Sequence, residues 1–379
     1  MELHRAQNAQ LAGHRIAEVA FYTARARYPR LHGKNAIRGY HGFGGNVSLA
    51  VITTDQGAHG WGALCTGLKQ ALSARDSIVG KPLADLFAVE TGILDASLHA
   101  LDIALHDLAG KILGIPVSRM ISPEAVDHVK VYDGAIYMND IIPEDRPFGA
   151  QRVIQEAIDD YQAGHRVFKI KIGRGKMWME PQAGMARDIE ITRGIHQALP
   201  DALLMVDAND GYTYADCVAF LEGIGEAEIY WFEEPFRECE MENRRLRDYL
   251  RIHRPTTYIA DGESYTDIPL LMDLADKGLL DIWQPDVCGH GFTAWRALLQ
   301  EIVPKGYLSS PHAWGQVVKT HYCAHLAAAY PHHIPYIEAV LGDTEGIDYS
   351  GYTLQNGVLR VPQTPGFGMD FIWGESITE

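Results

Sequence analysis

Three carboxylates in the second half of the sequence have the type and spacing of ligands for a metal ion. Asp207, Glu233 and Glu263 each close an otherwise apolar run, at intervals of 26 and 30 residues. Carboxylates gathered in one place raise each other's pKa unless a cation lies among them. Oxygen ligands without Cys or His suit a hard cation, and Mg²⁺ fits best. The alternative, in which each carboxylate caps a helix or pairs with a surface lysine, explains one such residue more readily than three.

Two lysines are placed where they could exchange a proton with a substrate. Lys169 and Lys171 stand one residue apart among Phe168, Ile170 and Ile172, so both point to the same face of a buried strand. Two buried lysines depress each other's pKa, and a lysine brought toward neutrality can act as a general base. Lysines in contact with solvent would instead require an edge strand.

A candidate acid or base for the opposite side of a substrate lies further along the chain. Asp286 and His312 close consecutive runs, and a hydrogen bond between them would fix the tautomer of the imidazole and raise its basicity. Such a histidine taken alone is more often structural, but a lysine base across the site makes a second base plausible. Glu338, which closes the last run, could donate a proton or a hydrogen bond to a developing oxyanion.

These polar residues need elements that bring them together, and the pattern after residue 127 supplies them. Short apolar runs alternate with helical stretches at intervals of about 25–35 residues, which predicts parallel βαβ units. The eight runs cover residues 129–138, 167–173, 202–210, 228–236, 257–264, 281–286, 307–312 and 334–339, and the helical stretches include 148–162, 184–198, 214–223 and 292–303. Eight strands favour a closed (β/α)₈ barrel over an open doubly wound sheet, and the carboxyl ends of barrel strands meet at one rim. The first strand has no glycine-rich loop after it, which argues against a dinucleotide site.

The first 127 residues have a different pattern. Residues 15–24, 47–54 and 59–64 are typical of strands, and 28–45 of a loop rich in Gly, His and basic residues. The apolar period is helical from residue 67 to 113, most clearly over 94–113, where Gly114 and Pro116 end the pattern. We therefore predict an α+β capping domain over residues 1–127, the barrel over 128–364, and a tail over 365–379 that packs on the cap.

Composition excludes several classes of partner. The 379 residues carry a formal net charge of −16, which argues against a nucleic-acid partner. Hydrophobic residues make up 47% of the chain without a run of about 18 apolar residues, so no membrane partner is expected. Five cysteines without a CxxC pair indicate free thiols in a reducing compartment, and residues 1–20 show no signal-peptide core. We therefore predict a cytoplasmic protein.

With these residues in place, the sequence resembles the enolase superfamily, and within it the mandelate racemase-like subgroup. The stretch ALDIALHDLAGKILGIPV (100–117) is similar to the cap helix of that family. The barrel motifs KIKIG, VDAND, WFEEPF, IADGES, QPDVCGHG, SPHAWG and YIEA come in the family's order. Each motif is weak alone, but seven in register on eight strands are a strong signal.

The resemblance implies a mechanism in which Mg²⁺ binds a substrate carboxylate and stabilises the enediolate left by removal of the α-proton. The residues that would carry this chemistry are the metal ligands Asp207, Glu233 and Glu263, the base Lys171 with Lys169 beside the carboxylate, the acid or base His312 with Asp286, and Glu338 on the enediolate oxygen. Asn209 and Glu234 would lie behind the ligands. Two features depart from the family pattern: His290 replaces a common glycine, and the loop 173–184 is long enough to reach a substrate.

Bases on both faces allow two reactions. A substrate with a β-hydroxyl would lose it as water with His312 as the acid, and one without it would be racemised or epimerised. The candidate substrate-binding residues, suited to several hydroxyls and a distal anion, are Asn209, Arg30, His32, Lys34, Arg38, His41 and Trp314. We therefore predict the dehydration of a sugar acid, an aldonate or aldarate, to a 2-keto-3-deoxy product.

Other functions on the same barrel fit less well. A non-catalytic binding protein would carry broken catalytic positions, and none is broken here. A muconate-lactonising cycloisomerase typically has a lysine at the sixth strand end, where this chain has Asp286. Barrels of this kind commonly assemble, so we expect a homo-oligomer.

Overall fold

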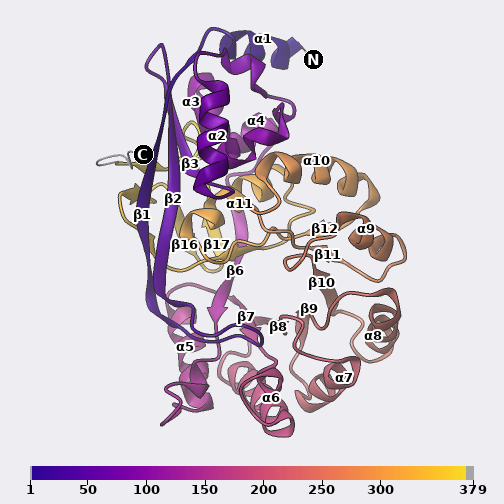
Figure 1. Cartoon of the computed structure of the whole chain (residues 1–379). Coiled ribbons are helices and arrows are strands. Elements are labelled where there is room, and N and C mark those ends of the chain that lie inside the picture. Colours follow the sequence, from indigo (N-terminus) through magenta and orange to yellow (C-terminus); the bar gives the residue numbers. More distant parts are fainter. Residues whose placement is uncertain (1, 373–379) are drawn as a thin grey trace.

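The structure of the chain is a computed structural model that describes residues 2–372. An antiparallel sheet with helices on one side lies beside a ring of strands surrounded by helices (Figure 1). This is the predicted (β/α)₈ barrel with an α+β cap. No helix within the described residues is both long and apolar enough to cross a membrane.

The cap is built on an antiparallel sheet in the order β14-β1-β2-β3. Its strands are β1 (Ile16–His32), β2 (Gly42–Thr54), β3 (His59–Ala63) and β14 (Asp343–Thr344). Much of β1 alternates between buried and exposed residues, so one face of the sheet packs against helices. Gly60 on β3 permits the closest approach, because a Cβ there would lie 2.2 Å from the backbone nitrogen of Leu108.

The loop predicted over residues 28–45 is shorter in the structure. β1 continues to His32, β2 begins at Gly42, and residues 33–41 connect them. The glycines and basic residues are typical of a loop, yet Gly44 (φ +133°) pairs with Arg27 and lets the two strands approach closely. Figure 1 shows these long strands reaching the barrel, where Lys34 pairs with Met138 just after β6.

The cap helices pack on one side of the cap sheet (Figure 1). They are α1 (Glu2–Leu11), α2 (Leu68–Ile78), α3 (Asp102–Leu113) and α4 (Val117–Ile121), with short 3₁₀ turns at Leu83–Asp85 and Ala96–Leu101. The helix predicted over 94–113 starts as the second of these turns and ends at Gly114 (φ +69°), as expected. The helical stretch predicted from residue 67 is interrupted by a hairpin, β4 (Phe87–Ala88) and β5 (Gly92–Ile93).

Seven of the barrel strands are parallel neighbours in sequence order, and the eighth pairs in parallel with the first. They are β6 (His128–Ile136), β7 (Val167–Lys171), β8 (Leu203–Asp207), β9 (Ile229–Glu233), β10 (Tyr258–Asp261), β11 (Ile282–Trp283), β12 (Leu308–Ser309) and β13 (Ile337–Ala339). Strands β11 and β12 are shorter than the predicted runs. Pro285 and Pro311 follow them within two residues, and proline has no N–H for the ladder.

Helices surround the strands and complete the βα units. They are α5 (Ala150–Gln162), α6 (Pro181–Ala198), α7 (Tyr214–Gly223), α8 (Glu240–His253), α9 (Ile268–Asp276), α10 (Phe292–Ile302) and α11 (Val317–Ala329), with 3₁₀ turns at Asn139–Ile141, Arg174–Lys176 and Val303–Lys305. Inside the barrel, one buried side chain from each of six consecutive strands forms an apolar layer that includes Tyr132, Met205 and Trp231. The catalytic candidates lie closer to the carboxyl ends than this layer.

After the barrel the chain returns to the cap. β14 joins the cap sheet, β15 (Ile347–Asp348) pairs with β18 (Asp370–Phe371), and the hairpin of β16 (Thr353–Gln355) and β17 (Val358–Arg360) pairs with β6. The Phe367 N–H donates to Asp107 Oδ1 (2.9 Å), and Trp61 Nε1 donates to the Met369 carbonyl (3.3 Å), so the described part of the predicted tail packs on the cap. Residues 373–379 of that tail lie outside the described residues. The boundaries at 127/128 and 364/365 stay predictions.

Candidate active site

The three candidate metal ligands come together at the rim of the barrel. Asp207 ends β8 and Glu233 ends β9, and the two are partners in the ladder between these strands. Glu263 follows β10 by two residues. One carboxylate oxygen from each lies within 4.8 Å of the others. The spacing in the sequence pointed to this convergence because one βα unit separates neighbouring strand ends.

The donor set fits a small hard cation. Asp207 and Glu233 are fully buried, and the Oε2 atom of Glu263 is buried with no hydrogen-bond partner among the described residues. A buried carboxylate oxygen without a donor costs free energy that a coordinated ion removes. Oxygen-only ligands at this separation suit Mg²⁺, so these residues can hold it.

The two lysines point into the barrel from β7, and both are buried. Lys169 Nζ lies 2.5 Å from Glu233 Oε1 and 3.1 Å from Glu338 Oε1. It is also 3.5 Å from Asp207 Oδ2, with which Lys171 Nζ forms its own ion pair. The lysines thus lie among the carboxylates and neutralise part of their charge.

The predicted lowering of the lysine pKa values is wrong for this structure. Burial lowers the pKa of Lys171, but the charge of Asp207 leads the effects that outweigh burial, and the pKa is raised. Burial also lowers the pKa of Lys169, but nearby charges outweigh it, with Glu233 having the largest effect, and they raise this pKa well above its ordinary value. The repulsion between the lysines is overcome by carboxylates from other strands. Lys171 can therefore act as a base when the charge of Asp207 is taken up by a cation.

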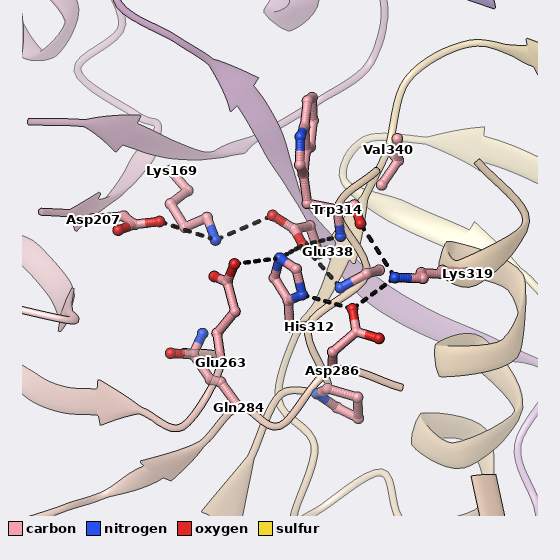
Figure 2. Close-up of polar contacts among 12 residues, drawn as sticks. Lys169, Asp207, Glu263, Gln284, Asp286, His312, Trp314, Lys319, Glu338 and Val340 are labelled. Atoms are coloured by element: carbon pink, nitrogen blue, oxygen red, sulfur yellow. Dashed lines mark hydrogen bonds and ion pairs between the residues drawn. The ribbon is translucent and has the colours of Figure 1, made fainter. Parts of the chain in front are cut away.

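His312 and Asp286 form the predicted hydrogen-bonded pair. His312 Nδ1 lies 2.8 Å from Asp286 Oδ2, and a β-bridge joins the two residues. The other ring nitrogen, Nε2, lies 3.2 Å from Glu263 Oε1 and 3.7 Å from Glu338 Oε2 (Figure 2). Burial lowers the pKa of His312, but Glu263 and Glu338 outweigh it and raise the pKa to about 9. The imidazole is therefore protonated at neutral pH and can donate from Nε2.

Glu338 is a charged acceptor in this structure, whereas the sequence suggested a donor. Its Oε2 accepts hydrogen bonds from the N–H groups of Ala313 and Trp314, each 2.9 Å long. Burial raises the pKa of Glu338, but the charges led by Lys169 outweigh it and lower the pKa to about 2. Gly134 on β6 makes room for this side chain, because a Cβ there would lie 2.4 Å from Glu338 Oε1.

A cavity of about 520 Å³ opens beside these residues and is lined by both parts of the molecule. Its lining includes Arg38, Tyr40, His41 and Tyr28 from the cap, and Glu263, Asp286, His312, Trp314 and Lys319 from the barrel. The structure thus brings Arg38, His41 and Trp314, from the predicted substrate-binding set, to the cavity. Its size is typical of a small-molecule site.

The other four residues of that set have different surroundings. Arg30 is ion-paired with Asp160, and Lys34 Nζ lies 2.7 Å from Glu144 Oε1. The ring of His32 is fully buried and stacks on Tyr28 at 4.5 Å between centroids. Asn209 lies behind the carboxylates, where its side chain donates to Glu234 Oε2 (3.2 Å) and its N–H to Asp207 Oδ1 (2.8 Å). These positions support the site without lining the cavity.

Of the two departures from the family pattern, the loop 173–184 has a structural role. In the loop 173–184, Arg174 is fully buried between Asp140 and Asp188. Trp178 Nε1 donates to the carbonyl of Asn35 in the cap (2.6 Å), so this loop binds the cap. His290 is not among the residues that line the cavity.

Lys319 and Tyr28 line the cavity but are not among the candidate residues predicted from the sequence. Lys319, in the first turn of α11, contacts Asp286, and Tyr28 near the end of β1 donates to the carbonyl of Gly315 (3.1 Å). The sequence pattern identifies polar residues at the ends of barrel strands, and neither Lys319 nor Tyr28 lies at such an end. The available signal was the position of Lys319, a lysine only seven residues after His312 and therefore close to the start of the helix that follows the strand.

An α+β cap on a (β/α)₈ barrel, with three carboxylates at the rim between a lysine and a histidine, defines the enolase class of barrel enzymes. Residues 152–374 match the family described as enolase C-terminal domain-like. The chain belongs to this family, and the resemblance found in its motifs is confirmed.

Solved structures and curated relatives agree with this assignment. Galacturonate dehydratase from Geobacillus sp., complexed with D-galacturonate and 5-keto-4-deoxy-D-galacturonate, has a TM-score of 0.87 and 31% identity over 95% of each chain. A mandelate racemase/muconate lactonizing protein from Geobacillus sp. Y412MC10, complexed with magnesium and tartrate, has a TM-score of 0.86 and 30% identity over 95% of this chain and 94% of that one. D-galactarolactone cycloisomerase from Agrobacterium fabrum is 26% identical over 76% of this chain and 75% of its own. The chain is an enzyme by family and by site.

Proposed function

We propose that the chain is a Mg²⁺-dependent sugar-acid dehydratase, which removes the proton α to a carboxylate and eliminates the β-hydroxyl as water. One observation carries the proposal: the carboxylate triad lies between two proton-transfer groups. Lys171 is paired with Asp207 on one side, and His312 Nε2 is 3.2 Å from Glu263 on the other. A substrate carboxylate at the triad would therefore have one group on each face of its α-carbon.

The two sides would do different work. Bound Mg²⁺ would supply positive charge that holds the substrate carboxylate and stabilises the enediolate. Lys171 would accept the α-proton at Nζ, and Lys169 would offset the charge that develops on the carboxylate. His312, held through Nδ1 by Asp286, would donate its Nε2 proton to the departing hydroxide. Glu338 and Asp286, which are not among the proposed metal ligands, act against burial to raise the pKa of His312 and would favour the protonated form that this step needs.

The cavity supports a polyhydroxylated substrate. Arg38, Tyr40 and His41 of the cap offer polar groups away from the triad. The ligands of the Geobacillus enzyme fit the same chemistry, because a 5-keto-4-deoxy uronate has its new carbonyl next to the carboxylate. We therefore propose an aldonate, aldarate or uronate as substrate, with the keto group forming next to the carboxylate; for an aldonate this is a 2-keto-3-deoxy acid.

A substrate screen tests this proposal. The purified protein with Mg²⁺ is incubated with aldonates, aldarates and uronates, and keto-deoxy products are measured by a carbonyl-specific assay and mass spectrometry. We expect product from at least one acid sugar, and its loss on chelation with restoration by Mg²⁺. If no acid sugar yields a keto-deoxy product, the dehydratase assignment is wrong.

A racemase or epimerase is the second candidate, and the pair of proton-transfer groups favours it. A proton returned by His312 to the face opposite Lys171 would invert the configuration of the α-carbon without loss of water. The same screen in D₂O separates the two reactions: deuterium incorporation with inversion, without a keto-deoxy product, would establish the racemase.

We also propose that the chain acts in the cytoplasm as a homo-oligomer. The free thiols are consistent with a reducing compartment, since the five cysteines are unbridged and Cys217, Cys288 and Cys323 are buried. Light scattering coupled to size-exclusion chromatography measures the assembly, and a single-chain mass at micromolar concentration would reject the oligomer.

A further inference from the structure

Lys319 lies at the cavity in contact with the aspartate that supports His312. It belongs to the first turn of α11, and its side chain is 12% exposed. Its Nζ lies 2.7 Å from Asp286 Oδ2 and 3.4 Å from the carbonyl oxygen of Trp314 (Figure 2). The pair between His312 and Asp286 is therefore part of a three-residue unit.

Asp286 is held through both of its oxygens. Oδ1 accepts the N–H groups of Cys288 (3.0 Å) and Gly289 (2.7 Å). Oδ2 is shared by His312 Nδ1 (2.8 Å) and Lys319 Nζ (2.7 Å). Two donors on each oxygen leave the carboxylate little freedom to rotate, so the direction of the imidazole ring is set by this arrangement.

Lys319 also links the supports of two reacting groups. The carbonyl of Trp314 accepts from Lys319, while the N–H of the same residue donates to Glu338 Oε2 (2.9 Å). One ammonium group thus joins Asp286 to the segment that holds Glu338. A side chain engaged in this way is suited to hold its neighbours in position.

The charge of Asp286 also holds Lys319 in position. The side chain of Asp286 is only 19% exposed, and Lys319 is its closest cationic neighbour in the pairs described. Removing one partner of such a pair leaves a poorly solvated charge that draws in water or turns to another donor. The hydrogen bond to His312 would then lose its defined direction.

We propose that Lys319 is a positioning residue for the dehydration, which holds Asp286 and, through it, the imidazole of His312 in the direction that delivers a proton to the leaving hydroxyl. This inference rests on the proposed function for its kinetic test. Lys319 contacts neither the metal ligands nor Lys171 in the contacts described, so removal of the α-proton does not depend on it.

The kinetic test compares Lys319→Met with the unaltered enzyme and with Lys305→Met. Lys305 forms an exposed ion pair with Asp276, is not among the residues that line the cavity, and is the matched control. We expect kcat of Lys319→Met to fall roughly 10- to 100-fold with KM within about twofold, as for lost support of a reacting group. Lys305→Met should keep kcat and KM. A rise in KM with kcat unchanged would make Lys319 a substrate ligand and overturn the proposal.

A double-mutant cycle shows whether Lys319 acts through Asp286. In an Asp286→Asn background, Lys319→Met should change kcat by less than about twofold, because the group on which it acts is already altered. Effects that multiply would show independent action and overturn the proposal. If Lys319→Met folds poorly, it is compared at reduced temperature with Lys319→Arg, which keeps the cation. Lys319→Arg should then have the higher kcat. An equal or lower kcat of Lys319→Arg would also contradict the proposal.

Two further measurements separate this inference from the proposed function. In D₂O, Lys319→Met should return more α-deuterated substrate per product formed, since the proton is still removed but elimination is slowed. The downfield Nδ1 proton resonance of His312, assigned with His312→Asn, should shift or broaden in Lys319→Met without any substrate. An unmoved resonance would overturn the positioning role, whereas absence of a keto-deoxy product from the unaltered enzyme would reject the function instead.

Discussion

The rim of the barrel and the connecting loop of the cap both contribute residues to the cavity, but they are built differently. The rim residues Lys171, Asp207 and Glu233 end parallel strands and are almost completely buried. In the cap, Arg38 and Tyr40 lie on the loop 33–41 and are exposed. Reacting groups are thus fixed by a rigid ladder, while groups for recognition lie on a segment that can vary.

This difference leads to a kinetic expectation. Substitutions at the rim should remove interactions made in the transition state and lower kcat, whereas substitutions in the cap loop should remove uniform binding and raise KM. A rim substitution that changes only KM, or a loop substitution that lowers only kcat, would contradict this division.

The largest effect is expected at the metal ligands. Asp207→Asn, and likewise Glu233→Gln or Glu263→Gln, should lower kcat/KM by about 10³-fold or more, since a charge-stabilising group is lost from a buried site. Calorimetric titration should show weakened Mg²⁺ binding. Asp201→Asn, an exposed change just before β8, is the control. Full activity with unchanged Mg²⁺ affinity in the three variants would show that these residues are not the metal ligands.

His312→Asn should produce the next largest loss. Removal of a general acid typically costs about 10²- to 10⁴-fold in the step it catalyses. The α-proton should still exchange in D₂O, because Lys171 lies on the other side of the triad. His332→Asn, at an exposed position, serves as the control. Loss of exchange together with dehydration would mean that the two sides of the rim do not act separately.

The protonation of His312 should respond to the metal. Without metal, the charges of Glu263 and Glu338 raise the pKa of His312 to about 9. A cation held by Glu263 offsets part of that negative charge, so Mg²⁺ should lower the pKa. NMR titration of the imidazole with and without Mg²⁺ measures the direction. An unchanged or increased pKa would place the cation away from Glu263.

The residues of the rim could be predicted from the sequence because each is identified by the residues next to it in the chain. A polar residue after an apolar run identifies a strand end, and the barrel brings consecutive strand ends together. The same logic gave the face of Lys169 and Lys171 but not their pKa values, since their carboxylate partners come from other strands. Lys319 could not be predicted in this way, because it lies in helix α11 and not at the end of a strand.

The cap was harder to predict because its partners are far away in sequence. Arg30 and Lys34 looked like substrate ligands by residue type, yet they pair with Asp160 and Glu144, more than 100 residues later. A basic residue in a glycine-rich segment gives no sign of which acid it will meet. The loop boundaries failed for a related reason, since Gly44 signals a turn but lies inside β2.

Arg38→Met tests the cap side of the comparison. Arg38 lines the cavity and is exposed, so its interaction with an anionic substrate is screened by water. We expect KM to rise by a factor of about 3 to 10 with kcat within about twofold. A fall in kcat with KM unchanged would mean that the cap takes part in the chemistry, and the division between rim and cap would fail.

Arg30→Met should have the smallest kinetic effect and is matched to Arg38→Met by residue type and by its place eight positions earlier. Arg30 is 14% exposed and ion-paired with Asp160, with Glu156 also close, so its charge is committed within the protein. Its removal leaves the carboxylate of Asp160 without its ion-pair partner, which should cost about 3 kcal/mol of stability. We therefore expect a lower midpoint of thermal unfolding with KM changed by less than about twofold. If KM rises as much as in Arg38→Met while the midpoint stays fixed, recognition extends from the loop into strand β1.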